Sequence, residues 1–179
     1  MIKKTNFYVL TGAPGTGKST ILSELSLQYV TVNEPAREVI AKQRSMNGTG
    51  VWEKDRGLFI KLLQEQSVSH FINTLDEGTV FFDRGVPDCI AYAGYGNVNV
   101  ESFVSTSKEY RYNEKVFLFE PWEGIYKNDD ERTMSYSEAL RFHERIVDAY
   151  EKLGYTLIKV PNVSVRERVD FILQTIQLT

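Results

Sequence analysis

Short apolar runs alternate along the chain with longer stretches in which apolar residues recur at helical spacing. Four runs bounded by turn residues have the composition of buried strands: residues 7–11, 79–83, 116–120 and 156–160. A weaker run of the same kind covers residues 30–33. Helical spacing is clearest over four stretches: residues 19–29, 58–71, 136–153 and 164–176. Strands that alternate with amphipathic helices predict an α/β fold with a mainly parallel sheet.

Two of the predicted helices carry terminal signals. Ser135 and Glu138 have the spacing of a capping box before one helix, and Gly154 can end that helix. Ser164 and Glu167 repeat the capping signal before the last helix. These signals support the helical assignment of the second half of the chain.

The junction between the first predicted strand and the first helix carries the clearest chemical signal. Residues 12–19 read Gly-Ala-Pro-Gly-Thr-Gly-Lys-Ser, a complete phosphate-binding loop of the form G-x-x-x-x-G-K-[ST]. A strand that turns into a helix at glycines aims backbone N–H groups at one point, and the helix dipole adds positive charge there. Lys18 can reach the β- and γ-phosphates, and the Ser19 hydroxyl can ligate Mg²⁺. We expect ATP, with GTP left open, to bind along nine residues: Gly12, Ala13, Pro14, Gly15, Thr16, Gly17, Lys18, Ser19 and Thr20.

A second signal lies at the end of the predicted strand 79–83. Asp83 would stand at the carboxyl edge of the sheet, where open parallel sheets bind their ligands. There it can hold the Mg²⁺ hydration shell or accept a proton from an attacking hydroxyl. Arg84, which follows it, can neutralise charge on a transferring phosphoryl group. The structural alternative is a turn aspartate that simply ends the strand.

The segment Glu34-Pro35-Ala36-Arg37 follows the weaker strand. Pro35 discourages continuation of that strand, so Glu34 can sit at an exposed edge and grip or deprotonate a substrate hydroxyl. Arg37 can pair with an anionic group of the substrate. In the alternative interpretation, Glu34 starts a surface helix on which Arg37 and Glu38 are solvated.

A charged segment over residues 123–133 contains Arg132. Beside a phosphate loop it can act as a basic flap, so we expect a short lid-like segment around residues 121–137 with Arg132 as a catalytic cation. A solvated connection between strand and helix is the alternative.

Composition and charge limit the number of domains, the partners and the cellular location that we expect. The 179 residues suit a single domain over residues 1–179. The net charge of −3 and the pI of about 5.5 give no general attraction to nucleic acid or anionic membrane. The single Cys89 leaves no disulfide within the chain and suits a reducing compartment. Because no stretch resembles a signal peptide or a membrane span, we expect a cytoplasmic protein without membrane insertion and without a nucleic-acid partner, and a homodimer is compatible with the sequence.

Taken in order, these motifs resemble the small P-loop kinases and, more closely, the NadR-like AAA-type predicted ATPases. The resemblance rests on six segments: residues 12–19, 34–38, 82–85 with Asp88, 119–122, 130–132 and 154–161. It implies a three-layer P-loop NTPase fold whose five-stranded parallel sheet, in the order 2-3-1-4-5, is flanked by helices. It also implies that Asp88 contributes to the substrate site and that residues 161–163 approach the nucleotide base.

Two functional classes remain. The leading hypothesis is a kinase that transfers the γ-phosphate of ATP to a small, nucleoside- or nucleotide-like acceptor. In it Lys18, Glu34, Asp83, Arg84 and Arg132 are catalytic, Ser19 and Asp83 hold Mg²⁺, and the substrate is bound by Glu34, Arg37, Arg84 and Asp88. Either Glu34 or Asp83 is the base. The alternative is a nucleotide-hydrolysing or nucleotide-controlled module that acts on a protein or lipid partner.

The sequence departs from the motifs of two better-known families of P-loop proteins. Motor ATPases of the AAA+ type usually place Glu after the strand-ending Asp, whereas Arg84 follows Asp83 here. The guanine-binding motif Asn-Lys-x-Asp and the Asp-x-x-Gly motif of signalling GTPases are both absent from the sequence. These differences disfavour a motor or a GTPase switch.

Overall fold

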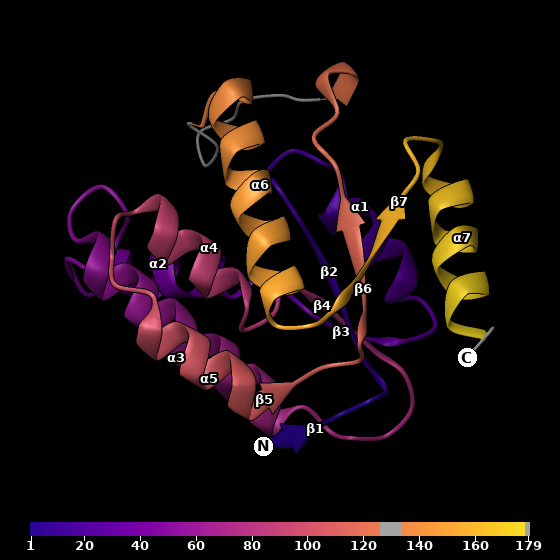
Figure 1. Cartoon of the computed structure of the whole chain (residues 1–179), viewed down its shortest axis with the longest axis horizontal. Helices are drawn as coiled ribbons and strands as arrows, with labels where there is room; N and C mark the ends of the chain where they lie inside the picture. Colours follow the sequence, from indigo (N-terminus) through magenta and orange to yellow (C-terminus); the bar gives the residue numbers. More distant parts are fainter. Residues whose placement is uncertain (126–133, 178–179) are drawn as a thin grey trace.

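The computed structural model describes residues 1–125 and 134–177, and it is built around one parallel sheet (Figure 1). The strands are β1 (Ile2–Lys3), β2 (Phe7–Gly12), β3 (Val30–Val32), β4 (Val80–Asp83), β5 (Tyr110–Arg111), β6 (Lys115–Phe119) and β7 (Thr156–Val160). The helices are α1 (Lys18–Leu25), α2 (Pro35–Ser45), α3 (Arg56–Asn73), α4 (Asp88–Tyr95), α5 (Glu101–Glu109), the short 3₁₀ turn η1 (Glu123–Ile125), α6 (Tyr136–Lys152) and α7 (Val165–Gln177).

Five strands form the main sheet in the order β3-β4-β2-β6-β7, and every neighbouring pair is parallel. Counted along the chain within that sheet, the order is 2-3-1-4-5, as predicted. The central strand β2 places Val9 opposite Phe82 of β4 and opposite Val116 of β6. The carboxyl ends of β4, β2 and β6 therefore meet at one edge, which is the edge where α/β proteins bind ligands.

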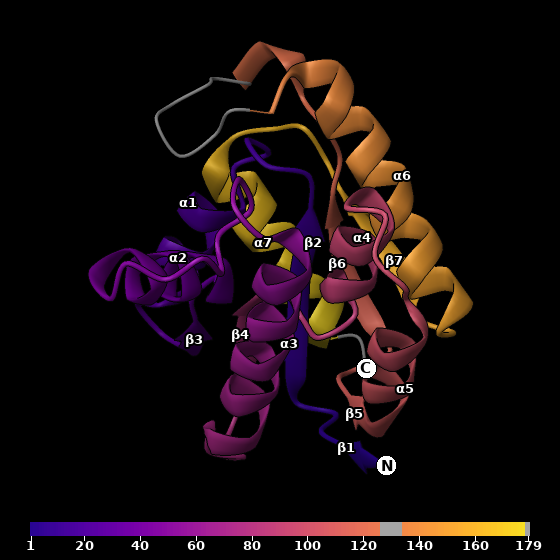
Figure 2. The ribbon, with the colours of Figure 1, turned by 90° about the vertical axis from the view of Figure 1, so that its left-hand side faces the viewer.

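Helices cover both faces of the sheet, which completes the predicted three layers. Alternate residues of β2 point to opposite faces. Phe7 packs in a core that includes Tyr150 of α6, whereas Leu10 packs with Ile21 of α1 and Ile172 of α7. Two views at right angles place α6 on one side of the sheet and α1 with α7 on the other (Figures 1 and 2). Burial on both faces is why the strands are continuous apolar runs and not alternating ones.

The sequence did not predict α4, α5 or the two-stranded β1–β5 pair. It gave a helix after Glu34, which is α2, only as an alternative interpretation of that segment. A separate apolar cluster joins these helices to α3 through Val39, Phe59, Cys89 and Phe103. In α4 the run that contains Cys89 is apolar on nearly all sides, so it shows no period that separates helix from strand. No helix in the two described ranges is long and apolar enough to cross a membrane.

Candidate functional site

The phosphate loop connects the end of β2 to the start of α1, as the sequence predicted. Gly12 has φ 140°, and a Cβ there would overlap the backbone carbonyl of Phe119 on the adjacent strand. Gly17 is the N-cap of α1 in the left-handed conformation, at φ 84°. Both positions require glycine, because an L side chain would be strained at either φ and would collide at Gly12. The loop thereby brings its backbone amides to the N-terminus of α1.

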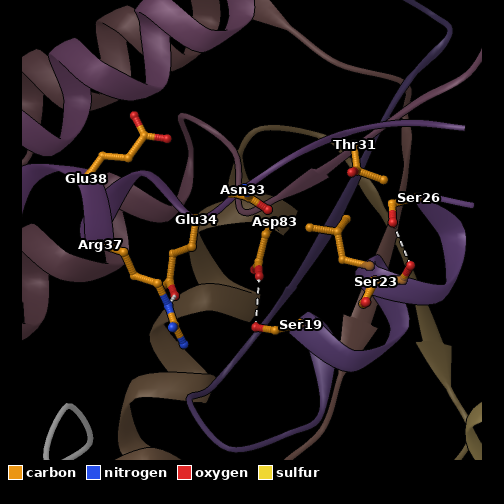
Figure 3. A pocket seen from close by; sticks show the side chains of 10 residues that line it. Ser19, Ser23, Ser26, Thr31, Asn33, Glu34, Arg37, Glu38 and Asp83 are labelled. Carbon is orange, nitrogen blue, oxygen red and sulfur yellow. Dashed lines mark hydrogen bonds and ion pairs between the residues drawn. The ribbon is translucent and has the colours of Figure 1, made fainter.

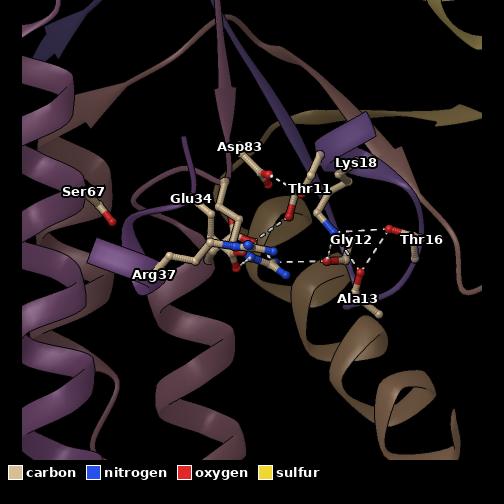
Figure 4. Close-up of polar contacts among 12 residues, drawn as sticks. Thr11, Gly12, Ala13, Thr16, Lys18, Glu34, Arg37, Ser67 and Asp83 are labelled. Atoms are coloured by element: carbon tan, nitrogen blue, oxygen red, sulfur yellow. Dashed lines mark hydrogen bonds and ion pairs between the residues drawn. The ribbon is translucent and has the colours of Figure 1, made fainter. Parts of the chain in front are cut away.

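The Lys18 side chain folds back into the loop (Figure 4). Its Nζ donates to the carbonyl oxygens of Gly12 at 3.1 Å and Ala13 at 2.8 Å, and to Oγ1 of Thr16 at 3.2 Å. Burial and the positive charge of Arg84 together lower the pKa of Lys18 to about 8, against the opposing effect of nearby carboxylates. The amine thus lies within the loop, where an anionic phosphate would raise its pKa again.

Ser19 and Asp83 meet across the gap between α1 and β4 (Figure 3). The Ser19 hydroxyl donates to Oδ2 of Asp83 at 3.2 Å. The other oxygen, Oδ1, is buried and has no hydrogen-bond partner among the described residues. Burial raises the pKa of Asp83, although the Lys18 ammonium opposes that rise. A buried carboxylate oxygen without a donor, beside a hydroxyl, fits the oxygen ligands and water shell that Mg²⁺ prefers.

Arg84 is the electrostatic centre of the site. It is buried, with its Nε bonded to Oε1 of Glu34 at 2.8 Å and its Nη1 bonded to the Gly12 carbonyl at 3.0 Å. Burial disfavours its charge, but Tyr92 and the carboxylates around it outweigh that effect and raise its pKa well above the ordinary value. Its backbone lies at φ 71°, a conformation that costs a non-glycine residue about 1–3 kcal/mol. The surrounding bonds hold this strained residue against the phosphate loop.

Glu34 is the N-cap residue of α2, but its side chain does not cap that helix. The carboxylate turns instead to Arg84, and its Oε2 lies 3.6 Å from Nε of Arg37. Burial raises the pKa of Glu34, but the charge and hydrogen bond of Arg84 outweigh burial and the net shift is downward. The structure therefore combines both interpretations of this segment, because Glu34 precedes a helix and also faces the site.

An open cleft of about 440 Å³ lies beside these groups. Its lining includes Glu34, Arg37, Asp83, Ser19 and Asn33, and Figure 3 shows these side chains around it. The cleft brings the predicted metal ligands and the predicted acceptor-binding carboxylate to a common surface. A small molecule in it would lie next to the end of the phosphate loop.

Asp88 is deeply buried, and both of its oxygens are occupied. Oδ1 accepts from Arg84 at 2.9 Å and from Thr11 at 2.6 Å, whereas Oδ2 accepts from the Gly85 amide at 2.9 Å and from the Tyr150 hydroxyl at 2.6 Å. The sequence suggested that Asp88 contacts substrate. The geometry shows that Asp88 holds Arg84, and its contact with substrate stays a prediction. Thr11 and Tyr150 were not identified from the sequence, because neither belongs to a recognisable motif.

Two further residues complete the comparison with the sequence predictions. Arg168 of α7 was not predicted, yet it is buried and its Nη1 donates to the Thr16 carbonyl at 3.2 Å. Its spacing of four from the buried Ile172 was the one available signal that it faces inward. Arg132 lies outside the described residues, so its catalytic role stays a prediction.

A family model described as an AAA domain matches residues 7–168. A comparison with curated proteins found no match.

Solved structures resemble the whole chain. Thymidylate kinase from Candida albicans has a TM-score of 0.74 at 15% identity, covering 96% of this chain and 91% of that one. Deoxyadenosine kinase from M. mycoides has a TM-score of 0.64 at 14% identity, covering 96% and 98%. Shikimate kinase from Aquifex aeolicus has a TM-score of 0.59 at 20% identity, covering 96% of each chain. These likenesses show that the fold is that of the P-loop kinases.

Proposed function

This chain belongs to the AAA domain family, and from that premise we propose that it is a Mg²⁺-dependent kinase for a small molecule. The reaction would transfer the γ-phosphate of ATP to a hydroxyl or phosphate oxygen of a nucleoside- or nucleotide-like acceptor. Among its structural neighbours are proteins named as thymidylate and deoxyadenosine kinases, which supports that class of acceptor. Within the family we place the chain with the NadR-like ATPases.

The donor half of the site is the phosphate loop. Backbone amides over residues 12–20 would bind the phosphates, and the ammonium of Lys18 would leave its carbonyl partners to contact the β- and γ-phosphates. Mg²⁺ would be held by Ser19 and by the water shell on Asp83. The ion would neutralise part of the negative charge of the phosphates.

The acceptor half rests on one observation, the bond from Arg84 to Glu34. Arg84 joins Glu34 to the Gly12 carbonyl of the phosphate loop, so the carboxylate stands at a fixed distance from the donor site. The Glu34 side chain is 20% exposed and lines the cleft, whereas Asp83 is almost fully buried. We therefore assign Glu34 as the group that orients the acceptor and takes its proton, with Arg37 as a contact for an anionic substituent.

We also propose a cytoplasmic location, since the single Cys89 is a buried free thiol and needs no oxidising compartment. Residues 121–137 keep their proposed role as a lid-like segment. The oligomeric state is left open.

The direct test is an acceptor screen with Mg-ATP. Incubation with nucleosides, nucleotides and other hydroxylated metabolites should give one phosphorylated product, detected by mass spectrometry. A broad panel with no product would refute the kinase assignment.

Glu34→Gln separates transfer from nucleotide binding. Loss of a positioned proton acceptor should lower kcat by about 10²-fold or more, with the Kd for ATP almost unchanged. Glu65→Gln, which alters an exposed carboxylate of α3, is the matched control and should keep full activity. Equal turnover in the two variants would favour a nucleotide-controlled binding module, which has no need of Glu34.

A further inference from the structure

The guanidinium of Arg168 packs against the back of the phosphate loop. The residue lies in the first turn of α7 and is only 5% exposed. Its Nη1 donates to the Thr16 carbonyl at 3.2 Å, and a Cβ placed on Gly17 would lie 3.0 Å from the same nitrogen. The contact therefore falls on the peptide that joins Thr16 to Gly17, within the motif itself.

The contact with the Thr16 carbonyl also sets the direction of the Gly17 N–H. A planar trans peptide directs its C=O and its N–H in opposite directions, and none of the described peptide bonds is cis. Because Arg168 holds the Thr16 carbonyl towards α7, the N–H of Gly17 must point away from α7. Gly17 is also the N-cap of α1, where N–H groups converge on a bound anion.

Among the described residues, few groups compensate the charge of Arg168. Its Nε is buried without a hydrogen-bond partner among the described residues, and Nη1 meets a neutral carbonyl. The indole of Trp122 lies over the guanidinium, 5.8 Å from ring centre to Cζ. A buried cation with neutral neighbours costs stability, and an anionic polyphosphate in the adjacent loop would offset that cost.

We propose that Arg168 is a positioning residue for the donor, which fixes the peptide between Thr16 and Gly17 so that the Gly17 N–H faces the phosphates. Its contact with the Thr16 carbonyl distinguishes this role from a direct phosphate contact. The inference rests on the donor site of the proposed function and adds to it a residue 152 positions away in the sequence.

The test compares Arg168→Met with Arg166→Met. Arg166 is an exposed residue of the same helix, so both variants lose one positive charge from α7 but only the first loses the loop contact. Titration calorimetry with Mg-ATP and with tripolyphosphate, which has no base, should show about tenfold weaker binding of both probes to Arg168→Met. Arg166→Met should bind both as the wild type does, and Arg168→Lys should recover part of the loss.

Three results would overturn the inference. The first is unchanged binding of both probes to Arg168→Met. The second is weaker binding of ATP alone to Arg168→Met, which would place Arg168 at the base. The third is an equal loss of binding in Arg166→Met. If Arg168→Met does not fold, Arg168→Gln decides, because its side chain is too short to reach the Thr16 carbonyl, and wild-type tripolyphosphate binding in that variant contradicts the inference. Failure of the wild-type chain to bind either probe would instead refute the proposed donor site.

Discussion

At the scale of single residues, the site is a set of charges removed from water and balanced against one another. Two cations, Lys18 and Arg84, lie among the carboxylates of Glu34, Asp83 and Asp88, and four of these five side chains are almost fully buried. In such surroundings each group depends on its neighbours for its protonation state. The raised pKa of Asp83 and the lowered pKa of Lys18 are both effects of burial that a bound Mg²⁺ and a bound phosphate would reverse.

The pKa of Lys18 makes ATP binding depend on pH. In the free protein that pKa is about 8, and the negative phosphates raise it, so above pH 8 the complex holds more protons than the free protein. ATP affinity should therefore be insensitive to Lys18 below about pH 7 and fall as pH rises through 8. Calorimetry at pH 8.5 in buffers of different ionisation enthalpy should show uptake of about three quarters of a proton. Lys18→Arg, which stays protonated, is the matched control, and uptake that persists in it would contradict the assignment to Lys18.

At the scale of elements, the buried carboxylate of Asp88 ties a strand to two helices. Thr11 is the second-last residue of the central strand β2, Asp88 begins α4, and Tyr150 lies in the last turns of α6. Their hydrogen bonds fix the ends of these elements around Arg84. The position of the guanidinium is thus a property of three packed elements, since the strained backbone of Arg84 would not hold it alone.

Tyr150→Phe tests this connection. The ring stays in the core, but Asp88 loses one donor and keeps its buried charge, which should cost about 1.5–3 kcal/mol in the free energy of unfolding. Tyr29→Phe removes a hydroxyl from a ring that packs on Phe81, and a change within about 0.5 kcal/mol is expected there. Urea unfolding followed by circular dichroism measures both. Equal stability of the two variants would show that the Tyr150 hydroxyl contributes nothing to the network.

At the scale of the whole molecule, the strand order decides where the chemistry occurs. Because β2 lies between β4 and β6, the phosphate loop, Asp83 and the end of β6 share one edge of the sheet. α1 and α7 meet on one face, so the loop lies between the sheet edge and the first turn of α7. A ligand in the loop touches several parts of the fold at once, and its binding stabilises all of them together.

Mg-ATP should therefore raise the thermal stability of the whole chain. At a concentration of 100 times Kd the stabilisation is about 2.7 kcal/mol, which corresponds to a rise in Tm of about 5–10 °C. Differential scanning calorimetry measures it. Lys18→Ala should lose most of the shift at the same ATP concentration, and removal of Mg²⁺ with EDTA should reduce it in the wild type. A full shift in Lys18→Ala would argue against binding in the phosphate loop.

Much of the fold was predictable because its signals are local. Each core strand is a short apolar run, and the capping boxes at Ser135 and Ser164 span only four residues each. The helices α4 and α5 were missed for the complementary reason. The α4 sequence is apolar on nearly all sides, and α5 has only nine residues, most of them polar, so neither gives a clear helical signal.

The sequence by itself determined the phosphate loop, because this motif is a continuous segment whose glycines, lysine and serine act through their own backbone and nearest neighbours. The tertiary structure alone decided how the rest of the site is held together. Tyr150 bonds Asp88 across 62 residues, and Arg168 reaches Thr16 across 152. Such contacts depend on which faces of distant helices are buried, and the separation of the two partners in the sequence does not predict them.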